Sequence, residues 1–116
     1  RQRQMCIRDR GNQVKNATHY QQILEQKLPA VLTTLANAHH VSIGYFDHLA
    51  FSNTLRAAPE VAGLKDLDTP CQATYPDVKP VCADPDSHYY WDEWHPTRKV
   101  HSLAAEAMLE TLKASR

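Results

Sequence analysis

The sequence lacks several features that mark whole classes of protein. It has no block of like charges, and its 13 basic side chains are balanced by 13 acidic ones, so nothing predicts binding to nucleic acid or to anionic lipid. Its longest apolar runs are far too short to span a bilayer. It also has no low-complexity tract, and its 42% share of apolar residues excludes a disordered tail. What remains is one small domain with a modest core, which 116 residues are enough to build.

The first ten residues, RQRQMCIRDR, also lack the apolar segment that a secretory signal requires. They match instead the translation of a common sequencing-library adapter. Its bases ATG TGT ATA AGA GAC AG encode Met-Cys-Ile-Arg-Asp followed by Arg or Ser. We therefore predict that residues 1–10 are not native and that the native sequence starts near Gly11, with its front end missing. A short basic arm is the alternative.

With Cys6 set aside, only Cys71 and Cys82 remain, and no Cys-x-x-Cys pair is present. Both lie in the Pro- and Asp-rich stretch TPCQATYPDVKPVCADPD, which has little core of its own. A disulfide there would close a short loop, would stabilise the fold by about 3 kcal/mol, and would imply an oxidising compartment. We predict this disulfide; two unpaired cysteines in a cytosolic loop are the alternative. A zinc pair is disfavoured because the two cysteines lie eleven positions apart.

Between Thr18 and Ala38 apolar residues recur at three- and four-residue steps, which predicts an amphipathic helix. Its apolar positions are Leu24, Leu28, Val31, Leu32 and Leu35. Pro29 lies inside this helix, which is therefore either kinked there or begins there. The next segment, VSIGYF at residues 41–46, is short, mostly apolar and rich in β-formers, as is typical of a central strand of a parallel sheet. A helix followed by a strand is one unit of a layered α/β fold.

Two further helices are predicted. One follows Asp47 and ends near Ala58, directly before a proline. The other starts after Thr97, which is a good N-cap because its hydroxyl can accept a hydrogen bond from a backbone N–H one turn on. The apolar positions of this last helix are Val100, Leu103, Ala104, Ala107, Met108 and Leu112. Residues 59–91 between the two helices form an irregular segment with five prolines, and a loop that long is usually functional or covalently pinned.

A single strand cannot form a sheet, because both of its backbone edges would stay unpaired. The predicted fold class is therefore α/β, and we expect the chain to be the C-terminal piece of a larger domain with a parallel sheet.

The stretch YYWDEWHPTRKVH, residues 89–101, contains the candidate functional residues. The proline after His95 disfavours helical backbone there, so His95 is expected in a loop just before a helix, where its side chain can project into a cleft. Asp92, three residues back, can fold over to meet the ring in a tight turn. A carboxylate on Nδ1–H fixes the tautomer and leaves Nε2 free as a base. Trp91 and Trp94 could shield the pair from water, which would strengthen the interaction.

An Asp and a His at this spacing also occur in purely structural turns. However, YYWDEWHPTRKVHSLAAEAM resembles the last signature block of GDSL-type lipases and esterases, the SGNH hydrolases, which pairs Asp and His as D-x-x-H. In the lecithinase/haemolysin-like branch and in related acetylesterases the block reads close to aromatic-W-D-x-x-H-P-T, followed by a helix with a second His. The upstream helix, the segment VSIGYFD and the Pro-rich stretch with two cysteines agree in outline, so the resemblance covers about Asn12 to Lys113.

The resemblance implies a three-layer αβα SGNH-hydrolase-like fold with a parallel sheet, of which residues 11–116 would be the C-terminal portion. It implies an ester hydrolase that transfers an acyl group to water through a serine ester and needs no cofactor. His95 matches the catalytic histidine, which deprotonates the serine and then protonates the leaving alcohol. Asp92 matches the acid that orients His95. No G-D-S-L and no G-x-N-D occurs in the chain, so the serine and the oxyanion-hole residues have no counterpart here.

The implied protein is secreted or periplasmic and acts on a small-molecule or lipid ester, without stable membrane insertion; the chain alone should be inactive. Lipid, lysophospholipid and acetylated sugar all remain open as substrates. Two rival classes also remain open. A zinc-binding module would use Asp92, His95, His101 or His88, although no two of these histidines have the i, i+4 spacing of a familiar ligand pair. A non-catalytic domain would keep the block for packing. Asp47 is more readily a helix N-cap than the triad acid.

Overall fold

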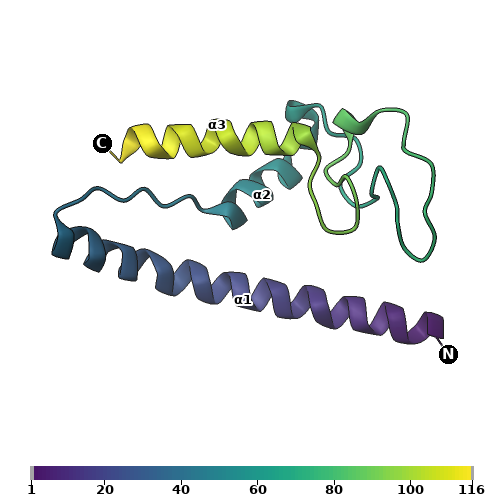
Figure 1. The fold of residues 1–116 in the computed structure, drawn as a ribbon, viewed down its shortest axis with the longest axis horizontal. Helices are drawn as coiled ribbons and strands as arrows, with labels where there is room; N and C mark the ends of the chain where they lie inside the picture. Colours follow the sequence, from purple (N-terminus) through teal and green to yellow (C-terminus); the bar gives the residue numbers. More distant parts are fainter. Residues whose placement is uncertain (1, 116) are drawn as a thin grey trace. The chain divides into compact units, whose positions relative to one another are not determined.

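The computed structural model describes the backbone of residues 2–115 and the side chains of residues 14–115. In chain order its elements are the helices α1 (Gln2–His39) and α2 (His48–Ala57), the 3-10 turns η1 (Pro59–Ala62) and η2 (Pro85–Ser87), and the helix α3 (Arg98–Ala114) (Figure 1). The chain divides into two compact units at Leu49–Ala50, and each is described by itself. None of the helices in the described part of the chain is long and apolar enough to cross a membrane.

The first unit consists mainly of α1, which confirms the helix predicted over residues 18–38 and extends it at its N-terminal side. The helix continues through Pro29, so the alternative of a helix that begins at this proline is wrong. Pro29 has no N–H and so donates no backbone hydrogen bond. Its carbonyl accepts a hydrogen bond from the Thr33 hydroxyl at 2.9 Å. The helix ends at His39, and the next residue, His40, has a left-handed φ of 53°. Val41 N–H closes the end by donating to the Ala36 carbonyl at 3.1 Å.

The strand predicted at residues 41–46 is wrong. Between Gln2 and Ser115 the structure contains no strand, and this segment is an open connection between α1 and α2. The reason is that a strand is formed only in a pair, and the structure contains no second strand beside this segment between Gln2 and Ser115. The chain as described is therefore mostly helical and has no sheet, in contrast to the α/β class expected from its sequence.

Helix α2 confirms the helix predicted after Asp47. The second unit has a small core where α2, the irregular segment and the first turn of α3 meet. Gly63 ends η1 with a φ of 74°, a left-handed conformation that glycine adopts without a Cβ penalty, and the next residue turns into the core. The buried members of the core are Leu64, Tyr89 and Val100, against which Phe51, Leu55, Ala62, Leu67 and Tyr90 pack.

Helix α3 confirms the helix predicted after Thr97, which takes the N-cap position. The predicted capping bond is wrong, however. The Thr97 side chain is only 1% exposed, and its hydroxyl donates to the His88 carbonyl at 2.8 Å instead of accepting from the helix. A buried carbonyl without a partner is costly, so this hydroxyl is used to fasten α3 to the irregular segment. Of the apolar positions predicted for this helix, Val100 is buried, whereas Met108 and Leu112 are exposed.

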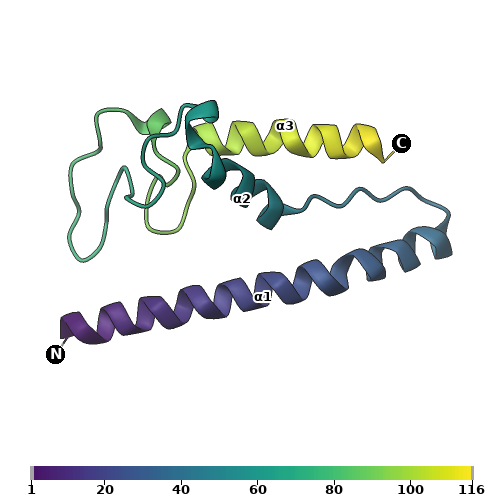
Figure 2. The same ribbon diagram turned by 180° about the vertical axis from the view of Figure 1, so that it is seen from behind.

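The irregular segment between η1 and α3 is held by hydrogen bonds and by one covalent link. The predicted disulfide between Cys71 and Cys82 is confirmed, with an S–S distance of 2.01 Å. Beside it, Cys82 N–H donates to the Cys71 carbonyl at 2.8 Å. Asp66 and His88 form a parallel bridge, so that the two sides of the segment run next to each other. Figures 1 and 2 show these loops gathered at the N-terminal end of α3.

Candidate functional site

The site loop, residues 89–97, is a tight loop that leads directly into α3. Two backbone hydrogen bonds close its base: Thr97 N–H donates to the Tyr89 carbonyl at 2.9 Å, and Trp91 N–H donates to the His95 carbonyl at 2.8 Å. Tyr90 and Pro96 form an antiparallel bridge between them. Because Pro96 has no N–H and disfavours helical backbone before it, His95 lies outside the helix, which begins only after Thr97.

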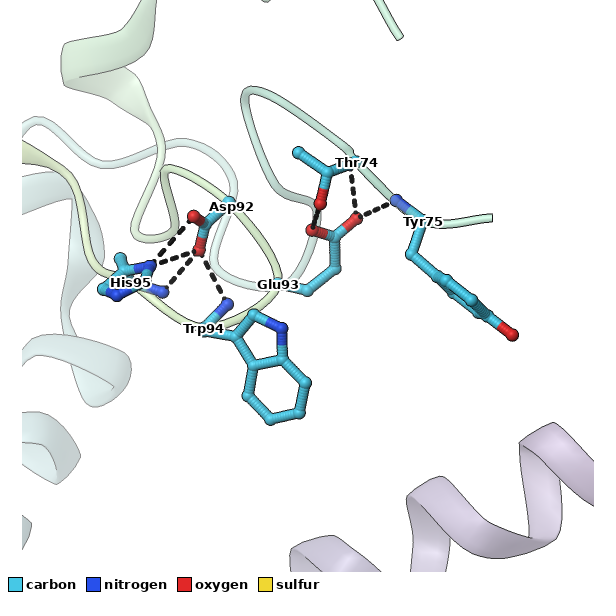
Figure 3. Close-up of polar contacts among 6 residues, drawn as sticks. All are labelled: Thr74, Tyr75, Asp92, Glu93, Trp94 and His95. Atoms are coloured by element: carbon cyan, nitrogen blue, oxygen red, sulfur yellow. Dashed lines mark hydrogen bonds and ion pairs between the residues drawn. The ribbon is translucent and has the colours of Figure 1, made fainter. Parts of the chain in front are cut away.

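Asp92 organises the interior of this loop. Its Oδ1 accepts hydrogen bonds from the backbone N–H groups of Trp94 at 2.8 Å and of His95 at 2.7 Å, which is the local turn that a short Asp side chain favours. Both carboxyl oxygens also lie 2.9 Å from Nδ1 of His95 (Figure 3). The contact between Asp92 and the ring that the spacing predicts is therefore present in the structure.

The charge of Asp92 determines which nitrogen of the neutral imidazole carries the proton. The Trp94 N–H, followed by the His95 ring, lowers the pKa of the Asp92 carboxyl below its ordinary value, so this group is ionised at neutral pH. An ionised carboxylate only accepts hydrogen bonds, so Nδ1 of His95 must be the donor. In the neutral ring the other nitrogen, Nε2, then carries a lone pair and can accept a proton.

The imidazole is open to solvent. The His95 side chain is 71% exposed, whereas that of Asp92 is 20% exposed. The expectation that two tryptophans shield the pair is wrong for Trp94, which is 78% exposed and whose indole is directed away from the ring in Figure 3. Since Asp92 binds the Trp94 N–H, the turn leaves that side chain on the outside. Trp91 is also partly exposed.

Glu93 makes contacts that no feature of the sequence predicts. Its Oε1 accepts from the backbone N–H groups of Thr74 at 2.7 Å and of Tyr75 at 3.0 Å, and its Oε2 accepts from the Thr74 hydroxyl at 2.7 Å (Figure 3). The Thr74 hydroxyl, the Tyr75 N–H and the Thr74 N–H together lower the pKa of Glu93 to about 2. Thr74 lies 19 residues before Glu93, across the Pro-rich segment, and no periodicity or motif connects the two.

The disulfide-bonded segment, residues 71–82, runs along the base of the site loop. Cys71 N–H donates to the Tyr90 carbonyl at 3.0 Å, and Gln72 N–H donates to the Trp91 carbonyl at 2.7 Å. The same segment therefore reaches the loop by backbone bonds at its base and through Glu93 at its tip.

Helix α2 supports the first residues of the site loop. The Arg56 guanidinium lies 4.7 Å from the centroid of the Tyr89 ring and donates to the Tyr90 hydroxyl at 2.9 Å. The hydroxyl of Ser52 lies 3.1 Å from that of Tyr89, which is buried. Cation–π contact and hydrogen bonds of this kind fix both tyrosines, and with them the point where the loop starts.

A pocket borders the loop on the side of α3. It is lined by Pro85, Trp91, Pro96, Thr97 and Arg98. Arg98 is paired with Asp86 through two hydrogen bonds of 2.9 and 2.8 Å, so the charge at the pocket rim is balanced. The remaining lining is largely apolar, and Trp91, the residue directly before Asp92, forms part of it.

The other histidines proposed as zinc ligands have separate roles. Nδ1 of His88 lies 2.9 Å from the Thr69 carbonyl, and His101 is exposed one turn into α3. Among the side chains that the structure describes, no three His, Cys, Asp or Glu residues form a group that could hold a metal ion. The zinc-binding alternative therefore has no ligand cluster in this part of the chain.

Asp47 lies in the first unit, where it hydrogen-bonds to Glu25. This bond and the nearby negative charge raise the pKa of Glu25 above its ordinary value. The helix-cap role suggested for Asp47 stays a prediction.

Comparison with known proteins agrees with these observations. A family model described as GDSL-like Lipase/Acylhydrolase matches residues 5–108 of the chain, a range that includes the disulfide and the whole site loop. No curated protein matches the chain.

Proposed function

The chain belongs to the family of GDSL-like lipases and acylhydrolases, and we propose on that premise that it carries two members of a catalytic triad, His95 and Asp92. Enzymes of this family are ester hydrolases in general, and the family implies the SGNH fold. The proposed reaction is hydrolysis of a carboxylic ester by way of a serine ester, with no cofactor. The observation that carries the proposal is the position of the Asp92 carboxylate, with both oxygens 2.9 Å from Nδ1 of His95.

In this proposal, Nε2 of His95 takes the proton of the serine hydroxyl as the serine oxygen attacks the ester carbonyl. The imidazolium that forms is stabilised by the ionised Asp92, and it gives the proton to the leaving alcohol oxygen when the ester C–O bond breaks. A water molecule then repeats the sequence: His95 takes its proton, its oxygen attacks the acyl group, and the serine leaves with the proton. Asp92 stays ionised throughout, which fits its lowered pKa.

We further propose that residues 11–116 are the C-terminal portion of an SGNH hydrolase domain, with residues 1–10 not native. The GDSL serine and the G-x-N-D asparagine do not occur in the sequence. Val41 and Ile43, two apolar residues of the segment 41–46, are exposed in the described chain, which fits a segment that packs against another part of a larger domain. On this proposal the chain alone is inactive.

The disulfide supports a secreted or periplasmic location. Cys71 and Cys82 are bonded in the structure, and disulfides persist mainly in oxidising compartments. The proposed substrate is an ester of a small molecule or a lipid. The largely apolar lining of the pocket beside Trp91 suits the uncharged part of such an ester.

The test uses the complete enzyme, which contains this chain together with its serine, and a p-nitrophenyl ester. His95→Ala should lower kcat by about 10²–10⁴ with little change in KM, because proton transfer contributes to the transition state and hardly to substrate binding. The matched control is His101→Ala, a histidine that is exposed one turn into α3 and should change kcat little. If His101→Ala were the crippling change and His95→Ala were near wild type, the site loop would be only a packed turn.

A further inference from the structure

We propose that Glu93 is a positioning residue for the Asp92–His95 pair, because its carboxylate holds the tip of the site loop against Thr74 and Tyr75 of the disulfide-bonded segment. The three contacts of 2.7, 3.0 and 2.7 Å use both carboxyl oxygens (Figure 3). This inference rests on the proposed function of the pair, and it adds a residue that lies outside the triad.

The tip of the loop has few other attachments. The hydrogen bonds of Asp92 run to residues 94 and 95, so they set the shape of the turn but not its place against the rest of the unit. Trp94 and the His95 side chain are mostly exposed and contribute little packing. Among the hydrogen bonds of the described residues, those of Glu93 are the ones that connect residues 92–95 to a distant part of the chain.

The partner of Glu93 is itself well anchored. Thr74 follows Cys71 by three residues, and Cys71 is buried, bonded to Cys82 and hydrogen-bonded to the Tyr90 carbonyl. The site loop is therefore attached to one segment at two points, at its base and at its tip. Attachment at both points restricts rotation of the loop about its base, and the Asp92 contact ties the imidazole to the loop.

The Glu93 carboxylate is also kept away from the imidazole. It is the nearest acidic neighbour of Asp92 in the sequence, and a free carboxylate there could compete for the ring of His95. Three donors occupy it instead and favour its ionised form, as its pKa of about 2 reflects. The contact is thus retained at mildly acidic as well as neutral pH.

The variants separate positioning from stability in the complete enzyme. Glu93→Ala should lower kcat by about 10- to 100-fold and change KM less than twofold, because small displacements of a general base affect the transition state far more than binding. Glu93→Asp keeps the charge but is one methylene shorter, and it should lower kcat similarly. Glu93→Gln keeps an oxygen that can accept from both backbone N–H groups and should restore most of the rate. The matched control is Glu110→Ala, which removes an exposed acid paired with Lys113 and should leave kcat unchanged.

A double-variant cycle with Thr74→Val tests the contact itself. Thr74→Val removes the hydroxyl and keeps the backbone N–H, so we expect a smaller loss of kcat, and no further loss when Glu93 is already alanine. Losses that multiply independently would show that the two residues do not act through each other, and the inference would be overturned. Should Glu93→Ala fail to fold, Glu93→Asp carries the test, and wild-type kcat in that variant would overturn the inference.

His95→Ala, measured in the same series, distinguishes this inference from the proposed function. If His95→Ala abolishes turnover while Glu93→Ala and Glu93→Asp keep wild-type kcat, only the positioning role of Glu93 is refuted. If His95→Ala itself keeps wild-type kcat, the proposed function fails first.

Discussion

Replacing Asp92 with asparagine tests the acid of the proposed triad while leaving the shape of the site loop intact. The amide oxygen of asparagine can still accept from the N–H groups of Trp94 and His95, which Oδ1 of Asp92 binds at 2.8 and 2.7 Å. Its NH₂ group then takes the position of Oδ2, which lies 2.9 Å from Nδ1 of His95. A donor now faces Nδ1 beside the amide oxygen, which lies 2.9 Å from Nδ1 but already accepts from two backbone N–H groups, so the balance of ring tautomers shifts toward a proton on Nε2, where the serine proton would have to go.

The expected cost follows from the geometry. Asp92→Asn favours the inactive tautomer of the proposed base and removes the negative charge that would stabilise the imidazolium. His95 is largely exposed, so water screens part of that charge effect. We therefore expect kcat to fall by about 10²-fold, at the lower end of the 10²–10⁴ that general-base catalysis supplies, and less than in His95→Ala. The assay is steady-state hydrolysis of a p-nitrophenyl ester by the complete enzyme.

The control for loop structure is Asp92→Ala, which also removes the two backbone contacts of Asp92. It should lower both kcat and the melting temperature, whereas Asp92→Asn should lower kcat alone. Wild-type kcat in Asp92→Asn would refute the argument, because the tautomer would then not depend on this carboxylate. A loss of kcat in Asp92→Asn that tracks an equal loss of melting temperature would assign the residue to folding instead.

Four further outcomes are expected. Residues 11–116 alone should hydrolyse no p-nitrophenyl ester and should show no sharp cooperative melt; fast hydrolysis by this piece would refute its proposed status as a partial domain. Peptide mapping of exported protein without reduction should recover Cys71 joined to Cys82, and free thiols at both positions would contradict the bridge. The stabilising contribution of ionised Glu93 is complete above its ordinary pKa of 4.5 and is lost as pH falls through about 2. Between these pH values the melting temperature of the complete enzyme should fall more steeply than that of its Glu93→Gln variant. Equal slopes of melting temperature against pH would count against the contact. The native gene, sequenced from its source, should not encode residues 1–10 before Gly11.

The sequence was sufficient to predict the structural features that depend on residues close together in the chain. The contact of Asp92 with His95 spans three residues, and a proline and an N-cap position set where α3 begins. The disulfide could be predicted because a Pro-rich loop between two cysteines has little else to hold it. In each case the determining interaction lies within a dozen residues, so the spacing in the chain already contains most of the geometry.

Features that depend on distant partners were missed or were wrong. The segment 41–46 has the composition of a strand, but composition cannot supply the neighbour that would pair with it. The contact of Glu93 with Thr74 depends on the path of the loop between them, which is set by the disulfide and by backbone bonds at Tyr90 and Trp91. The outward position of Trp94 follows from the use of its N–H by Asp92, which no hydrophobicity pattern reports.

This division between local and distant contacts explains how the proposed Asp92–His95 pair can form although the described residues contain no sheet. The contacts that orient His95 lie within residues 71–97, on one disulfide-bonded segment and one short loop. None of them requires a strand. The proposed serine, by contrast, must be brought to Nε2 from elsewhere in the domain, and its position depends on how the layers of that domain pack together. The proposed acid and base can therefore be pre-organised locally, whereas on this proposal the rate of the reaction depends on how the rest of the domain is placed against this loop.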